Sequence, residues 1–191
     1  MRSAMKHVVP FVIALVVCPS FILLHELAHF GTGAWLGFEI HLHYAKVTGV
    51  IPAEKNTPQV NLFHASAGPL AQAILTVAGL IGLYLLRRKR RTLPATPLDW
   101  LATTLILNAG RWVAGLAGPP CCLDERYISE LLGMPASLLP GILGLLAIIP
   151  LVMAVRLHPP RSRLLPFTCL ILGGFGAAFV WLRLLGPILL P

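Results

Sequence analysis

Charged side chains are scarce in this chain of 191 residues, where Asp, Glu, Lys and Arg together make up 12%. A soluble domain usually carries about 25%, so the shortage excludes a large soluble domain. Hydrophobic residues, by contrast, account for 57% of the sequence. We therefore expect an integral, multi-pass membrane protein of the cell membrane, in which residues 1–191 form a single membrane-embedded domain.

Acidic residues are the rarest charged group, with seven Asp and Glu against fifteen Lys and Arg and a net charge of +8. The basic residues cluster at the ends of apolar runs, which the positive-inside bias produces, so we expect a lipid bilayer and no nucleic acid as partner. Cysteine is also rare. Cys18 and Cys169 lie in apolar runs, and Cys121 and Cys122 are adjacent, so no disulfide framework is expected.

Hydropathy predicts an all-α membrane protein, a polytopic bundle of about five transmembrane spans. The spans cover approximately residues 8–36, 62–86, 98–117, 136–155 and 164–190. Pro19 is expected to kink the first span, and the glycines at 173, 174 and 176 to bend the last. After the first span, residues 38–44 alternate apolar and polar side chains, and Thr48-Gly49 can turn such a strand into a small β-hairpin ending at Ile51.

The first span contains an H-E-x-x-H motif, His25-Glu26-Leu27-Ala28-His29. Two histidines four apart lie on one face of a helix and can bind one Zn²⁺ together. Glu26 is then placed as a general base, and the alternative is a buried Glu paired with Arg111. Ionisable groups at membrane depth are costly unless they pair or bind metal. The motif therefore predicts a zinc site.

A catalytic Zn²⁺ usually has three protein ligands and one open position. Asp124 is our expected third ligand, because it follows a span that ends at the same membrane face as the motif. Other acidic or thiol side chains remain open as rivals: Glu125, Glu130, Cys121 and Cys122. Asp124 and Glu125 can also be read as a solvated pair or as the cap of a following helix.

Three further residues are candidates for contact with the substrate or the transition state. Asn108 and Arg111 lie three apart on one face of the third span, where they can orient a substrate or stabilise an oxyanion. Arg111 can equally snorkel to the interface, and Asn108 can bond across helices. His64, at the start of the second span, is either a member of the site or an interfacial histidine.

These residues resemble the site-2 protease family of intramembrane zinc metalloproteases. The resemblance lies in H-E-L-A-H-F-G-T-G-A-W-L-G at 25–37, A-G-P-L-A at 67–71 and Leu123-Asp124, which is similar to the start of the family's L-D-G motif. It implies that His25, His29 and Asp124 hold the metal and that Glu26 is catalytic. It further implies a catalytic core over about 8–135, additional spans over about 136–190, and a hairpin that pairs with an unwound substrate.

The chain departs from the family pattern at three positions. Gln72 stands where the family has Asn, and Glu125 replaces the Gly of L-D-G. Asn108 lies sixteen residues before Asp124 and is followed by Ala-Gly-Arg, whereas the family's Asn-x-x-Pro lies just before its Asp.

Counting Lys and Arg places ten at one membrane face, with the N-terminus, and three at the other, with the motif. The larger group predicts a cytoplasmic N-terminus. The resemblance implies the opposite, since family members with the motif in their first span often have it facing the cytoplasm. Both orientations stay open.

The function we expect is that of a hydrolase, an intramembrane zinc metalloprotease that cleaves a transmembrane protein substrate within or near the bilayer. One alternative is a membrane zinc protease that uses Glu125 or Glu130 as its third ligand. Another is a non-catalytic zinc-binding membrane scaffold or partner protein. The sequence leaves the oligomeric state and the natural substrate open.

Overall fold

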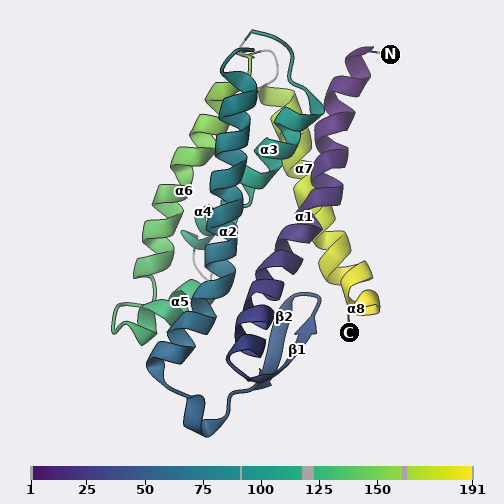
Figure 1. The fold of residues 1–191 in the computed structure, drawn as a ribbon. Helices are drawn as coiled ribbons and strands as arrows, with labels where there is room; N and C mark the ends of the chain where they lie inside the picture. Colours follow the sequence, from purple (N-terminus) through teal and green to yellow (C-terminus); the bar gives the residue numbers. More distant parts are fainter. Residues whose placement is uncertain (1, 91, 118–122, 161–162, 191) are drawn as a thin grey trace.

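The computed structural model describes residues 2–90, 92–117, 123–160 and 163–190. The chain is mostly helical, with one two-stranded sheet (Figure 1). In order, the elements are α1 (Arg2–Trp35), β1 (Glu39–His43), β2 (Lys46–Val50), η1 (Ala53–Lys55), α2 (Pro58–Arg87), α3 (Pro97–Leu107), α4 (Gly110–Gly115), α5 (Leu123–Leu131), α6 (Leu138–Leu157), α7 (Leu164–Val180), the π-helical η3 (Trp181–Leu185) and α8 (Gly186–Leu189).

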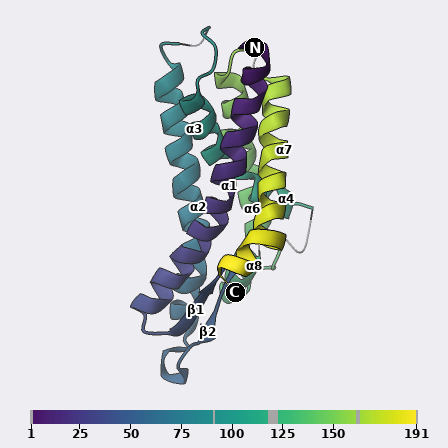
Figure 2. The same cartoon turned by 90° about the vertical axis from the view of Figure 1, so that its right-hand side faces the viewer.

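Four helical segments within the described residues are long and apolar enough to cross a membrane. They are Val8–Trp35 of α1, α2, α6 and the continuous run Leu164–Leu189 of α7, η3 and α8. They run side by side along one axis in Figures 1 and 2, and large apolar side chains cover their outer faces. An apolar outer surface of this length is suited to lipid, which supports a membrane protein.

The fifth expected span, residues 98–117, is not one continuous helix. It is divided into α3 and α4, and between Ile106 and Trp112 the backbone hydrogen bonds shorten from the i→i−4 to the i→i−3 pattern. The break falls at Asn108, whose side chain bonds to Gln72 of α2. The break coincides with Asn108-Ala109-Gly110-Arg111, an interruption of the apolar run.

The hairpin after α1 is present, but its turn lies earlier than we predicted. Residues 39–43 pair antiparallel with 46–50, so the chain turns at Tyr44 and Ala45. Thr48 lies inside β2 and hydrogen-bonds the His43 ring. Gly49 faces Ile40, and a Cβ there would lie 2.7 Å from the Ile40 Cα. Gly49 therefore serves a close approach of the strands and not a turn.

The last span also differs from expectation, because α7 is regular through its glycines. At Gly173 a Cβ would lie 2.5 Å from the Phe11 carbonyl of α1, so this glycine permits close packing of the two helices. The irregular turn comes later, as the π-helical segment η3. There the Trp181 indole donates to the Tyr44 carbonyl of the hairpin turn at 2.8 Å.

A buried ion pair joins the helices at the end of the bundle that carries the N-terminus. Arg87 of α2 and Asp99 of α3 are both fully buried, 3.6 Å apart, and Arg87 also donates to carbonyls that include Leu157. Asp99 completes a capping box with Thr96. Breaking one partner of such a pair costs about 3–5 kcal/mol. The pair therefore fixes how α2, α3 and α6 meet.

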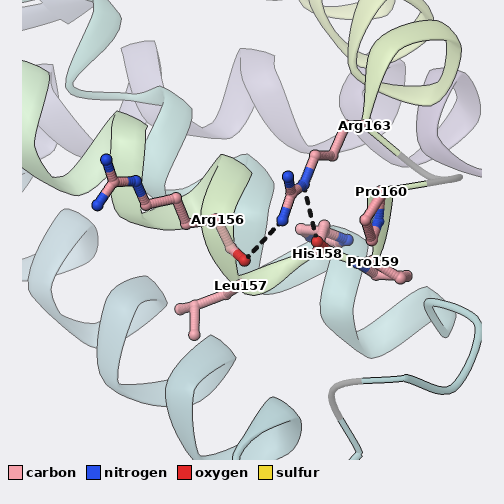
Figure 3. Close-up of a pocket in the computed structure, with 6 residues that line it drawn as sticks. All are labelled: Arg156, Leu157, His158, Pro159, Pro160 and Arg163. Atoms are coloured by element: carbon pink, nitrogen blue, oxygen red, sulfur yellow. Dashed lines mark hydrogen bonds between the residues drawn. The ribbon is translucent and has the colours of Figure 1, made fainter.

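His158 packs into the same end, just beyond α6. Its ring stacks on Trp100 at 4.3 Å between centroids and meets the Thr103 hydroxyl at 2.8 Å. Beside it, Arg163 donates to the carbonyls of His158 and Arg156 and borders a cavity of about 350 Å³ (Figure 3). Burial is the main cause that lowers the pKa of His158, to about 4.

This low pKa predicts an acid-sensitive fold. A free histidine has a pKa of about 6.5, so the unfolded chain takes up a proton first as the pH falls. Above about pH 6.5, neutral His158 makes its full contribution to the free energy of unfolding. This contribution decreases as the pH falls to the pKa of the folded state, about 4. The loss is up to about 3 kcal/mol of unfolding free energy. Unfolding of wild type and His158→Gln in detergent, at pH 7.5 and pH 4.5, tests this.

The expected result is a smaller acid-induced loss in the His158→Gln variant. Equal losses in both proteins would show that His158 does not cause the acid sensitivity.

Candidate metal centre

The two histidines of the motif lie on one face of α1, four residues apart. Their Nε2 atoms are 3.3 Å from each other, and each residue is 6% exposed. Burial of two imidazoles without hydrogen-bond partners would reduce the free energy of unfolding. The neighbouring helices supply polar partners for both rings.

Asp124, at the start of α5, completes the group. Its Oδ2 lies 2.9 Å from His25 Nε2 and 3.7 Å from His29 Nε2. Donor atoms bound at about 2.0–2.1 Å to a tetrahedral Zn²⁺ lie about 3.3 Å apart. The three observed separations span that value, so the residues fit a tetrahedral metal. Within the described part of the chain, His25, His29 and Asp124 form a group that can hold a metal ion.

A hydrogen bond fixes which nitrogen His29 presents to this group. Its Nδ1 lies 2.9 Å from the backbone carbonyl of His64, which can only accept. The proton therefore sits on Nδ1, and Nε2 is left to bind a metal. Outer contacts of this kind orient the ligands of metal sites.

Asp124 is suited to bind a cation because it stays ionised. Burial is the largest single influence and raises its pKa, but the interactions with His25 and His29 outweigh it. The net pKa lies well below the usual value for a carboxylic acid. A metal ligand must be deprotonated, so the carboxylate is ready to bind near neutral pH.

Gly68 of α2 lets the second span approach the two imidazoles. A Cβ at this position would lie 2.6 Å from His25 Nε2 and closer still to His29 Nε2. No side chain can be accommodated there without moving one of the two imidazoles. The glycine of A-G-P-L-A is thus explained by contact with the metal group.

The group opens into a cavity of about 630 Å³ between α1, α2, α5 and the hairpin. Glu26 lines this cavity next to His25 and is only half buried. It forms no hydrogen bond or ion pair with any residue that the structure describes, Arg111 included. A carboxylate in this position is free to accept a proton from a molecule in the cavity.

Arg111 links the metal group to the rest of the bundle. Its Nη2 lies 3.1 Å from Asp124 Oδ2 and 3.2 Å from Glu125 Oε2, and its Nη1 donates to Gln72 at 2.8 Å. Nη1 also lies 3.1 Å from His25 Nδ1. One guanidinium therefore contacts residues of α1, α2 and α5.

The rival third ligands are not in the group. Glu125 is fully buried, and its two oxygens accept from Arg111 and the Trp112 indole. Glu130 is exposed on α5 and is not a member of the group. Cys121 and Cys122 lie outside the described residues.

Asn108 and His64 occupy different places relative to the cavity. Asn108 is 8% exposed and bonds across helices to Gln72, which in turn bonds Arg111. The His64 ring lines the cavity, packed against Phe38 and His29. Its Nε2 is buried and has no hydrogen-bond partner among the described residues.

The sequence did not predict that Glu125, Gln72 and Trp112 support the site through hydrogen bonds. Two of these positions are departures from the family pattern, and that was the only available signal.

The chain was also compared with models of protein families, with curated proteins and with solved structures, and none matched.

Gly68→Ala is expected to weaken zinc binding about 10–100-fold, because the added methyl group displaces the imidazoles. Gly82→Ala, in the same helix, is the matched control, since its Cβ would meet only the Ala102 Cβ at 3.9 Å. The zinc affinities of the two variants and of wild type are measured by competition with a chelator. Equal affinities would show that Gly68 is not needed for the site.

The third ligand is tested by Asp124→Asn and Glu125→Gln. Asp124→Asn should lose bound zinc, because it removes a negatively charged donor. Glu125→Gln should keep one zinc per chain, because this side chain contacts Arg111 and Trp112 and not the metal group. The zinc content of the purified proteins is measured by metal analysis. Loss of zinc from Glu125→Gln but not from Asp124→Asn would make Glu125 the ligand.

Proposed function

We propose that this protein is an intramembrane zinc metalloprotease, a divergent member of the site-2 protease family, that cleaves a peptide bond of a membrane-protein substrate. The observation that carries the proposal is the convergence of His25, His29 and Asp124 beside an unengaged Glu26 in one cavity. A purely structural metal site has no need of a base next to its ligands.

In the proposed mechanism, the three residues of the metal group and Glu26 each have a defined role. A zinc ion held by His25, His29 and Asp124 would supply a Lewis acid that polarises the scissile carbonyl and lowers the pKa of water. Glu26 takes a proton from the attacking water and passes it to the leaving amine.

Arg111 is the best candidate for stabilising negative charge in the transition state. Its guanidinium borders the cavity, and its side chain is 28% exposed, so its donors are accessible from the cavity. The fully buried Glu125 holds it in place. A donor that is fixed in advance costs little reorganisation when charge develops. Asn108 contributes indirectly, through Gln72.

The membrane arrangement fits such an activity. The short helices α3 and α4 lie between the N-terminal end of the bundle and the site end (Figure 1). In the proposed arrangement they form a fifth, broken crossing. Irregular backbone at membrane depth is tolerated where it is buried in protein or lines a cavity. We place the protein in the cell membrane, with the hairpin at the site face.

The test uses Glu26→Gln in purified protein with a single-span model substrate. The variant should keep wild-type zinc content and lose at least about 100-fold in cleavage rate, because it removes the base but no ligand. Glu54→Gln, an exposed glutamate outside the cavity, is the control and should cleave normally. Zinc content and product formation are measured on the same samples.

Full cleavage by Glu26→Gln would contradict the assigned mechanism. Wild type that binds zinc and cleaves nothing across a substrate panel would favour the non-catalytic scaffold.

A further inference from the structure

Lys46, the first residue of β2, lines the same cavity as Glu26 and the metal group. The hairpin contributes three adjacent residues to this wall, Ala45, Lys46 and Val47. The Lys46 side chain is exposed and has no hydrogen bond or ion pair within the described residues. It is thus a free cation at the wall of the proposed active site.

Contacts outside the cavity hold the hairpin turn next to Lys46 in place. The Tyr44 carbonyl accepts the Trp181 indole N–H at 2.8 Å, and the Tyr44 amide donates to the Leu190 carbonyl at 3.2 Å. Gly186 packs closely on the Tyr44 ring, where a Cβ would lie 2.7 Å from Cδ2. These contacts keep Lys46, two residues further on, beside the cavity.

Apart from Glu26, the other charged side chains of the cavity have partners within the protein. Asp124 belongs to the metal group, and Arg111 is paired with Asp124 and Glu125. Glu26 is reserved for proton transfer in the proposed function. Lys46 is therefore the charge that a bound segment can neutralise.

We propose that Lys46 makes the cavity select substrate segments with an acidic side chain next to the scissile bond. The inference rests on the proposed function, which supplies the scissile bond. A segment that enters beside β2 is extended, and its side chains alternate between the two faces. One of these side chains would pass Lys46. A carboxylate at this position is attracted to Lys46, whereas a cationic side chain meets a like charge.

The experiment compares three single-span peptides that are identical except for Glu, Gln or Lys next to the cleavage site. Wild type should cleave the Glu peptide about tenfold faster, in kcat/KM, than the Lys peptide. Lys46→Gln should remove the preference, and Lys46→Glu should invert it. Arg126→Glu reverses a charge on α5 outside the cavity and should leave the preference unchanged. Equal zinc content in all variants verifies folding.

Binding of the same peptides to zinc-loaded Glu26→Gln, followed by fluorescence anisotropy, separates the two proposals. If no protein cleaves any peptide but binding follows the order Glu, Gln, Lys and inverts in Lys46→Glu, the protease function fails and the selectivity stands. If cleavage occurs with no dependence on the peptide charge or on Lys46, the selectivity is overturned and the protease function stands.

A third arm varies the anionic lipid in the micelles. A Lys46 effect that follows lipid charge and not peptide charge would overturn the proposal, since the partner would then be a lipid phosphate.

Discussion

The structure depends on one constraint: two imidazoles and a carboxylate are brought together inside an apolar bundle. His25 and His29 come from α1, while Asp124 arrives from α5, 99 residues after His25. Each group alone would be costly to bury, but together they form a donor set with the spacing of a tetrahedral metal site. The close approach of α2 at Gly68, the break after α3 and the short α5 all serve this convergence.

The departures from the family pattern form one connected network around the site. Glu125 holds Arg111, Arg111 contacts Asp124 and His25, and Gln72 joins Arg111 to Asn108. Glu125 is fully buried, so its carboxylate would be costly to leave without a partner, and Arg111 supplies one. The same guanidinium contacts Asp124 and so connects the buried Glu125 to the metal group. The residues that differ from the family pattern therefore have structural contacts of their own in this chain.

Local patterns in the sequence were sufficient for the long helices, for the presence of the hairpin and for the shared face of His25 and His29 on α1. The i, i+4 spacing of His25 and His29 determines their approach without any tertiary information. Asp124 was identified from connectivity, because the ends of successive spans meet at one membrane face. The break at Asn108 and the partners of Glu125 involve contacts between separate elements, and the turn at Tyr44 is held by Trp181 and Leu190 from the other end of the chain. Periodicity and composition carry no information about such contacts.

X-ray absorption spectroscopy of the zinc-loaded protein at the zinc K-edge tests the central claim most directly. The arrangement of His25, His29 and Asp124 predicts a first shell of nitrogen and oxygen only, at about 2.0–2.1 Å, with the scattering pattern of two imidazoles. Sulfur scattering at about 2.3 Å would instead implicate a cysteine and contradict the assigned ligands. A shell with fewer than two imidazoles would contradict them equally.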